Sequence, residues 1–290
     1  MVNPGEARIA ADPPPEASAE LASERLSGIE VPATGHVAPR ADLDPHSATA
    51  GASPTPPATG LARLFDWRRT GRLVARIAGG LAAILLVLIV LYRFVDPPVS
   101  TLMLGEAVLG REVRQTWVPI EEISPNLVKA VIMSEDDQFC AHWGIDWQAM
   151  QAAWRAKRGF RGASTISMQV TKNLFLWPGR SYVRKVLELP ITLVANLVWP
   201  KRRTLELYLN VAEWGPGIYG AEEAARFHFG TSASRLSAYQ AALLAAALPN
   251  PILRKAGRPS PAVRSRAAKV QRMIGYADSY AACALPTKGE

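Results

Sequence analysis

The chain has 290 residues and a formal net charge of +8, from 33 basic and 25 acidic side chains. The charge is uneven, because residues 1–60 carry −5 and the remainder carries +13. Residues 1–60 also contain ten prolines and no aromatic side chain, so they cannot bury enough apolar surface to offset chain entropy, and we expect a disordered tail. The composition excludes collagen, a wholly disordered chain and a disulfide-rich miniprotein. The basic remainder indicates an anionic partner, which is a nucleic acid, a membrane surface or a phosphorylated ligand.

The sequence offers little support for metal or disulfide chemistry. Its two cysteines, Cys140 and Cys283, cannot form a disulfide framework, and we expect both to be free, although a single bridge is compatible with the count. No HExxH or CxxC motif occurs, so neither a structural zinc site nor a zinc hydrolase is expected. We therefore predict no metal ligands.

Residues 77–95 form a strongly apolar run, with Arg76 before it and Arg93 near its end. A membrane span needs about 20 apolar residues, and long basic side chains at its ends reach the interface, so we predict a transmembrane helix. The alternative is a buried core helix, which fits poorly because the run is apolar on every face.

The charges beside this run predict its orientation. Five arginines lie in the basic segment 61–76, whereas one follows closely behind the run. The positive-inside rule therefore places residues 1–72 in the cytoplasm and residues 96–290 outside, which is the periplasm in a cell with two membranes. This orientation argues against nucleic acid as the partner.

Asp96-Pro97-Pro98 should end the apolar helix, and a mainly helical domain is expected over residues 96–255. Ser124-Pro125 is a typical N-cap and first-turn pair, with apolar residues following at helical spacing. Strand patterns are scarce, and the best are residues 100–104 and 113–118. A C-terminal extension, residues 256–290, has no predicted role. The predicted helices are 125–136, 146–158, 164 or 165 to 174, 181–198, one capped by Thr204 and running to about 214, 221–229 and 237–248.

The first candidate site is SEDDQFCAHWG, residues 134–144, where three acidic residues end a predicted helix. The C-terminal end of a helix dipole disfavours negative charge. A carboxylate there, packed beside Phe139 and Trp143, would have a raised pKa and exchange protons near neutral pH. The alternative is a solvated acidic turn, which the spacing alone favours slightly.

Two further segments combine hydroxyl, amide and basic side chains. In residues 162–173, Thr165, Gln169 and Lys172 share one stripe of a helix whose glycine-led N-terminus can receive an oxyanion. An ordinary amphipathic helix and a solvated charged face are the alternatives, and spacing does not exclude them. The side chains that can converge on a diphosphate are Lys172, Arg180, Arg184 and Lys185, with Glu188 holding a base in place.

Three other patterns carry less weight. Residues 201–210 place Glu206 and Asn210 on one helical face, either as support for a site or as surface charge. Residues 215–220 satisfy GxGxxG but follow a helix and contain a proline, so we dismiss a dinucleotide site. Residues 154–161 interleave bases with aromatics, as nucleic-acid binders do, but outside a membrane a lipid headgroup or lipid diphosphate fits better.

Together, four motifs are specific: EDxxFxxHxG at 135–144, GASTIxxQxxKN at 162–173, RKxxE at 184–188 and KxxxLExYLN at 201–210. In this order and spacing the chain resembles the peptidoglycan glycosyltransferase family, especially its monofunctional biosynthetic transglycosylases, over roughly residues 97–251. The resemblance implies a mainly α, lysozyme-like, two-lobed domain that sits partly in the outer leaflet. It also implies polymerisation of lipid II into β-1,4-linked glycan strands with release of undecaprenyl diphosphate.

The resemblance also implies roles for single residues. Glu135 matches the catalytic general base, which deprotonates the acceptor 4-hydroxyl while the donor anomeric carbon inverts. Glu188 matches a second catalytic glutamate, whose role stays open between positioning bases, metal contact and direct assistance. A divalent cation, Mg²⁺ or Mn²⁺, is compatible with a diphosphate, although no ligand cluster is visible. The implied substrate-binding residues are Asp136, Phe139, His142, Ser164, Thr165, Gln169, Lys172, Asn173, Arg180, Arg184 and Lys185.

Some features depart from the family or leave alternatives open. Thr204 and Gln240 differ from the usual family residues, which affects only local packing. No SxxK follows Gly230, so we expect no transpeptidase activity. A lysozyme-like lytic glycosidase would use its glutamate as an acid and would not need the basic cluster. A noncatalytic membrane scaffold that recruits division or elongation proteins is the alternative from another class. We expect lipid II, the growing strand and the cell inner membrane as partners, and no nucleic acid.

Overall fold

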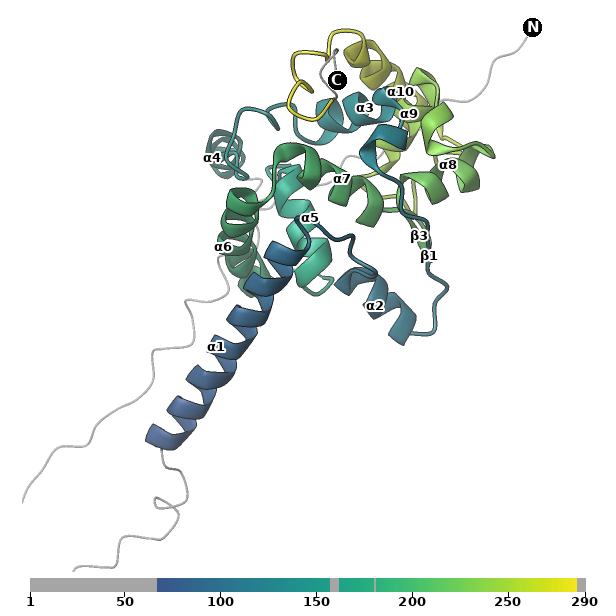
Figure 1. Cartoon of the computed structure of the whole chain (residues 1–290). Helices are drawn as coiled ribbons and strands as arrows, with labels where there is room; N and C mark the ends of the chain where they lie inside the picture. Colours follow the sequence, from purple (N-terminus) through teal and green to yellow (C-terminus); the bar gives the residue numbers. More distant parts are fainter. Residues whose placement is uncertain (1–66, 157–161, 180, 286–290) are drawn as a thin grey trace, which may run out of the picture. The chain divides into compact units, whose positions relative to one another are not determined.

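The computed structural model describes residues 67–156, 162–179 and 181–285. The predicted tail, the start of the basic segment 61–76 and Arg180 lie outside these residues. The described chain is mainly helical, as predicted, with three short strands (Figure 1). The helices are α1 (Trp67–Leu91), α2 (Thr101–Val108), α3 (Pro125–Glu135), α4 (Trp147–Arg155), α5 (Ile166–Phe175), α6 (Tyr182–Val198), α7 (Lys201–Val211), α8 (Ala221–Phe229), α9 (Ala238–Ala247) and α10 (Pro261–Ile274).

Helix α1 contains the predicted apolar run but begins earlier, at Trp67, and ends at Leu91, before the Asp96-Pro97-Pro98 stop. It is long and apolar enough to cross a membrane, and most of its side chains face outward. The buried core helix considered as an alternative is therefore wrong. The end of α1 is attached to the domain by Trp199, whose Nε1 donates to the Ile89 carbonyl over 2.7 Å.

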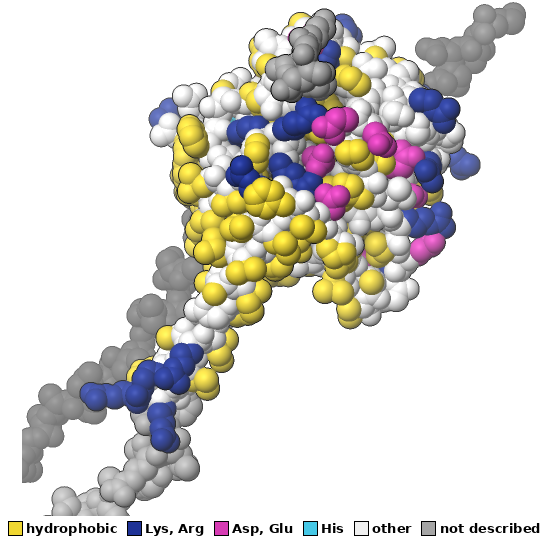
Figure 2. All heavy atoms as spheres, in the orientation of Figure 1, with side chains coloured by type: hydrophobic (Ala, Val, Ile, Leu, Met, Phe, Trp, Pro, Cys, Tyr) yellow, Lys and Arg dark blue, Asp and Glu magenta, His cyan; other side chains and the backbone are white. Residues whose placement is uncertain are grey.

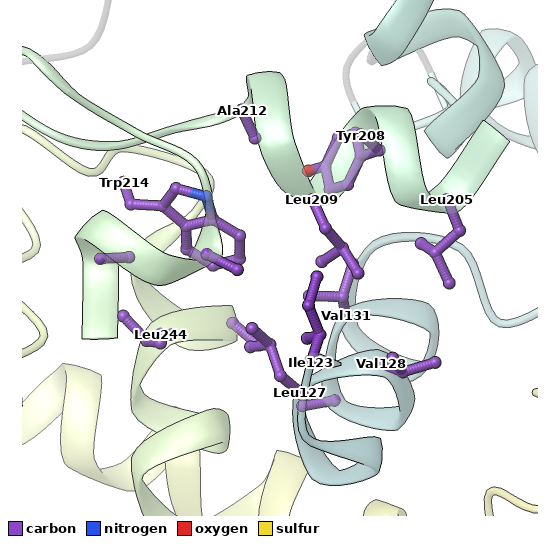
Figure 3. Packing of buried hydrophobic residues seen from close by; sticks show 14 of the residues in the cluster. Ile123, Leu127, Val128, Val131, Leu205, Tyr208, Leu209, Ala212, Trp214 and Leu244 are labelled. Atoms are coloured by element: carbon purple, nitrogen blue, oxygen red, sulfur yellow. The ribbon is translucent and has the colours of Figure 1, made fainter. Parts of the chain in front are cut away.

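Helices α3, α7 and α9 form the centre of the core (Figure 3). Helix α3 begins where predicted, because the Ser124 hydroxyl accepts the Asn126 N–H and Pro125 occupies the first turn. Figure 3 shows Leu209 of α7 lying against Val131 of α3. Helix α9 consists of alanine and leucine apart from Tyr239 and Gln240, and this small-residue composition lets α3 and α10 pack closely on it. The core therefore fixes both ends of α3, including the acidic residues at its C-terminus.

Two local predictions were wrong. Residues 100–104 form part of helix α2, because the Ser100 hydroxyl accepts the Met103 N–H over 3.2 Å and caps the helix. Thr204 does not cap α7, which begins at Lys201 after Pro200. Instead, Thr204 lies inside the helix and its hydroxyl donates to the Pro200 carbonyl over 3.3 Å. A hydroxyl residue caps a helix where its own backbone is extended, as at Ser100, and not where it is already helical, as at Thr204.

The predicted strand at 113–118 contains β1 (Arg114–Gln115). It pairs in parallel with β3 (Ile218–Tyr219), which also pairs antiparallel with β2 (Glu213–Gly215). Gly217 joins β2 to β3 with φ at 70°, and a Cβ there would lie 2.1 Å from the Glu112 carbonyl oxygen. The GxGxxG pattern is therefore explained in part by a close backbone approach in this small sheet.

The domain extends beyond residue 255, where its end was predicted. Helix α10 lies along α9 and α3 (Figure 1), and the residues after it reach Leu285. Its buried side chains recur at helical spacing between basic residues, a signal that was present in the sequence. These side chains are Val263, Ala267, Val270 and Ile274.

Candidate active site

Glu135 is the last residue of α3 and lies half-buried at the edge of a cleft. Gln169 on α5 donates from Nε2 to Glu135 Oε2 over 3.2 Å. Tyr208 on α7 donates its hydroxyl to Gln169 Oε1 over 3.2 Å, which turns the amide nitrogen of Gln169 toward the carboxylate. Among the described residues, no lysine or arginine forms an ion pair with Glu135. This carboxylate therefore has a neutral hydrogen-bond partner.

Burial raises the pKa of Glu135 above its ordinary value, and the negative charge of Asp136 raises it further. The hydrogen bond from Gln169 and the positive charges of Arg266 and Arg254 act in the opposite direction. The predicted direction is confirmed. The largest cause is loss of water around the carboxylate.

Asp136 organises the residues that follow α3, which we call the acidic turn (residues 136–144). Its Oδ1 lies 2.9 Å from His142 Nε2, and its Oδ2 accepts the Ile166 N–H over 2.9 Å. The Gly144 N–H donates to His142 Nδ1 over 3.1 Å. Because a backbone N–H can only donate, Nδ1 is the acceptor and Nε2 carries the proton toward Asp136. Asp136 and His142 therefore join the turn to the start of α5.

Phe139 is completely buried beneath this turn, so the prediction that it binds substrate directly is corrected. Lys201 at the start of α7 places its Nζ 4.6 Å from the Phe139 ring centroid. This Nζ is buried and has no hydrogen-bond partner among the described residues. Burial lowers the pKa of Lys201 to about 8, and Asp136 opposes that shift. Phe139 and Lys201 thus support the turn from the core.

The residues of the second motif (162–173) mostly hold the structure together rather than face solvent. The Thr165 hydroxyl donates to the Gly144 carbonyl over 2.6 Å and accepts the Met168 N–H over 3.1 Å, so it caps α5 and holds the turn. Asn173 is buried and does not line the cleft, which corrects the prediction that it binds substrate. Gln169 reaches Glu135 instead of presenting its amide freely.

The third motif forms a buried cluster of charges. Glu188 is 2% exposed and accepts Arg184 Nη1 at 2.8 Å and Lys185 Nζ at 2.9 Å. Lys185 Nζ also donates to Ser164 Oγ over 2.9 Å. Burial lowers the pKa of Lys172 nearby, Glu188 opposes this, and Arg184 and Lys185 add to it. The predicted convergence of these residues is therefore observed, while Arg180 lies outside the described residues.

A cleft of about 210 Å³ opens beside Glu135. It reaches from Glu135 to Ser164, the hydroxyl that Lys185 contacts. A carboxylate of raised pKa thus opens on the same cleft as a serine bound to the basic cluster. The cleft is lined by Met133, Ser134, Glu135, Asp136, Asp137, Asp146, Ala149, Gly162, Ala163, Ser164 and Thr165.

Several residues at the site were not predicted. Cys140 and Cys283 form a disulfide, so the prediction that both are free is wrong. The two cysteines are 143 positions apart, and only the packing of the C-terminal segment brings them together. Tyr208 and Lys201 lie in the fourth motif, which indicated their importance but not their contacts. The charges of Arg254 and Arg266 near Glu135 had no signal in the sequence.

Comparison with known proteins identifies the family. Residues 102–274 match the transglycosylase family. The chain is similar to the biosynthetic peptidoglycan transglycosylase of Rhizobium meliloti, with 52% identity over 75% of this chain and 94% of that protein. The corresponding proteins of Rhodospirillum centenum and Agrobacterium fabrum are 51% and 53% identical, over 74% and 65% of this chain and 95% and 84% of their own lengths.

The chain therefore belongs to the transglycosylase family, among the biosynthetic peptidoglycan transglycosylases. It is a peptidoglycan glycosyltransferase of cell-wall synthesis. The biosynthetic class decides against the lytic glycosidase and the noncatalytic scaffold as its main function. Its substrate is accordingly a peptidoglycan glycan precursor.

Proposed function

We propose that the chain polymerises lipid II into β-1,4-linked glycan, with Glu135 as the general base and inversion at the donor anomeric carbon. The observation that supports this is the placement of Glu135 and Ser164 on one cleft, with Lys185 bound to that serine. The two ends of the cleft have the two chemistries that the reaction needs. One end removes a proton and the other stabilises a departing diphosphate.

Glu135 is suited to the acceptor side of the reaction. Its raised pKa makes the ionised form a stronger base than an ordinary glutamate, and no cation competes for its free oxygen, Oε1, among the described residues. Gln169 holds Oε2, so Oε1 is the atom that would take the proton of the acceptor 4-hydroxyl. The oxygen so activated would attack the anomeric carbon from the face opposite the diphosphate.

The basic cluster is suited to the leaving group. Lys172, Arg184 and Lys185 carry positive charge in a partly dry environment, where attraction to a diphosphate is stronger than in bulk water. Glu188 would position Arg184 and Lys185 rather than take part in bond making, because both of its oxygens already accept from these cations. Arg180, outside the described residues, would join this cluster.

Glu188 and Asp136 do not fit as ligands of a Mg²⁺ or Mn²⁺ ion at the diphosphate. Glu188 has both oxygens engaged by cations, and Asp136 has both engaged by His142 and the Ile166 N–H. A divalent cation needs free carboxylate or carbonyl oxygens. The proposed roles of these two residues therefore include no metal ligation.

We also propose that α1 anchors the chain as a single pass in the cell inner membrane, with the N-terminus cytoplasmic and the catalytic domain periplasmic. The arginines in the first turns of α1 support this orientation. The Cys140–Cys283 disulfide supports it independently, since disulfides persist in oxidising compartments.

Exposed apolar side chains beside α1 support contact of the domain with the lipid. Figure 2 shows hydrophobic side chains gathered where α1 meets the domain. On α6, Val183 and Leu197 are 66% and 74% exposed, and on α2, Val108 is 78% exposed. Apolar surface of this extent marks an interaction site rather than ordinary surface. Contact of this apolar surface with the lipid would place the cleft at the depth of a lipid-linked substrate.

The test is polymerisation by the purified full chain in detergent with labelled lipid II, followed by muramidase. We expect a polymer that muramidase degrades, and no polymer from Glu135→Gln. A Lys172→Met variant should retain the base but bind the lipid diphosphate more weakly, so its KM should rise. Absence of polymer from the parent chain, or equal activity of Glu135→Gln, would refute the proposal. Release of soluble fragments from preformed strands would instead indicate a lytic enzyme.

A further inference from the structure

The segment after α10, which we call the C-terminal strap (residues 275–285), is attached to the elements around the active site. Lys129 on α3 forms an ion pair with Asp278 of the strap. Arg202 on α7 donates to the Ala284 carbonyl over 3.2 Å. The strap thus contacts the helix that carries Glu135 and the helix that carries Tyr208. Its side chains buried in the domain are Ala277, Ala281 and Ala284.

The strap is also bonded covalently to the acidic turn. Cys283 forms a disulfide with Cys140, and its backbone N–H points to Cys140 Sγ at 3.4 Å. Cys140 lies between Phe139, which is buried, and His142, which bonds Asp136. The covalent attachment therefore falls inside the turn, five positions after Glu135.

The other contacts of the turn are noncovalent. Asp136 accepts the Ile166 N–H, His142 accepts the Gly144 N–H, and Phe139 packs in the core. On the outer side of the turn Trp143 is 75% exposed and adds no core packing. Among the described residues, the disulfide is the covalent link between the turn and a segment distant in sequence. Its loss would leave the turn held by noncovalent contacts.

We propose that the Cys140–Cys283 disulfide positions the acidic turn for glycosyl transfer, and that its reduction slows turnover while the chain stays folded. The part of this inference that concerns turnover rests on the proposed function. In the reduction, a dithiol supplies two electrons and two protons. The S–S bond breaks, each cysteine becomes a thiol, and the reductant closes to its cyclic disulfide. The C-terminal strap then becomes a redox-sensitive support of the active site.

The experiment compares three forms of the full chain in detergent: the oxidised parent, the parent reduced with dithiothreitol, and Cys140→Ala/Cys283→Ala. Hydrogen exchange by mass spectrometry follows the Ile166 and Gly144 amides, and lipid II polymerisation gives kcat and KM. In the reduced parent and in the double alanine variant we expect exchange at these amides to be at least tenfold faster than in the oxidised parent. We also expect kcat to fall about tenfold with KM unchanged, since small displacements of a catalytic group are costly. All measurements are made below the lowest melting temperature of the three.

Two controls separate positioning from general stability. Lys129→Ala removes the ion pair of the strap with α3 but keeps the disulfide, and should retain parental kcat and parental exchange at Ile166 and Gly144. Dithiothreitol should have no effect on the double alanine variant, and reoxidation of the reduced parent should restore kcat.

Three outcomes would overturn the inference. Parental exchange in the reduced parent and the double variant would mean that the bond does not hold the turn. Faster exchange with parental kcat would mean that the turn does not need to be held for the reaction. Loss of kcat with parental exchange would assign the effect to some other part of the chain. If the oxidised parent makes no polymer, the proposed function fails, while the exchange data still decide whether the bond holds the turn.

Discussion

Glu135 and Glu188 are the two glutamates of the site, and their surroundings are opposite. Glu135 ends α3, is half-buried and accepts one bond from the neutral amide of Gln169. Glu188 lies within α6, is 2% exposed and accepts from both Arg184 and Lys185. Among the described residues, the carboxyl group thus has no ion-pair partner in one place and two ion-pair partners in the other.

This difference separates the roles that the two residues can perform. A carboxylate without an ion-pair partner takes up a proton more readily than an ordinary glutamate once burial has raised its pKa. A carboxylate held between two cations keeps its charge and fixes the cations in place. The environment rather than the residue type therefore supports the proposed role of Glu135 as the base and of Glu188 as the residue that positions the cations. Substitutions at Glu135, Glu188, Gln169 and Tyr208 test this comparison.

The largest effect is expected for Glu135→Gln. The glutamine keeps the shape but cannot accept a proton, so the rate of lipid II polymerisation should fall by about 10²–10⁴-fold. Glu135→Asp should lose less, because a base remains at a longer distance. Initial rates of polymer formation measure both. Equal losses in the two variants would contradict a role as base.

Glu135→Gln, which should lower the rate, should raise the stability of the folded chain relative to the parent at higher pH. Because the folded pKa of Glu135 is raised, its contribution to stability is present below the unfolded pKa and is lost as pH rises through the folded pKa. Relative to the parent, Glu135→Gln should therefore become more stable as pH increases from 4 to 8. Denaturant unfolding at both pH values measures this, and a relative loss of stability at pH 8 would refute it.

The next effect is expected for Glu188→Gln, which leaves Arg184 and Lys185 without their buried partner. Removing one member of a buried ion pair costs about 3–5 kcal/mol in the free energy of unfolding. The KM for lipid II should also rise, because the two cations are no longer held at the cleft. Denaturant unfolding and initial rates give the two quantities.

Glu222→Gln is the matched control for that experiment. Glu222 is 6% exposed and pairs with Arg226, but it lies on α8, away from the cleft. It should lose stability without a change in KM. An equal rise in KM in both variants would show that general destabilisation, rather than the placement of the cations, causes the effect at Glu188.

A smaller effect is expected for Gln169→Met in the pH dependence. The Gln169 bond lowers the pKa of Glu135, so its removal should move the acid limb of the pH–rate profile to higher pH. In the parent, the limb itself should lie above the ordinary range of a glutamate. A limb at the same pH in parent and variant would show that another group titrates.

The smallest effect is expected for Tyr208→Phe, which removes the bond that orients the Gln169 amide. The acid limb should move in the same direction as in Gln169→Met but by a smaller amount, because the amide itself remains. Loss of one buried hydroxyl bond should cost about 1 kcal/mol in the free energy of unfolding. A larger shift than that of Gln169→Met would contradict a series of hydrogen bonds in which Tyr208 acts on Glu135 through Gln169.

Much of this arrangement could be predicted from local pattern. The caps at Ser124, Thr165 and Ser181 and the apolar spacing after them located α3, α5 and α6 within a residue or two. The pairing of Arg184 with Glu188 followed from their separation by one helical turn. These features depend on a few neighbouring residues, so they are present in the sequence itself.

The errors share a different cause. That Phe139 is buried, that Cys140 is bonded to Cys283 and that α10 completes the domain all depend on segments distant in sequence packing together. The C-terminal extension had no predicted role, yet it carries Arg266, whose charge acts on Glu135.

The sequence by itself determined the family motifs, the apolar helix α1 and the residue types of the candidate active site. Only the tertiary structure decided which glutamate has no ion-pair partner among the described residues, and that Cys283 bonds to Cys140 in the acidic turn. Helix signals act over three or four residues, whereas burial and charge pairing depend on which surfaces the folded chain brings together.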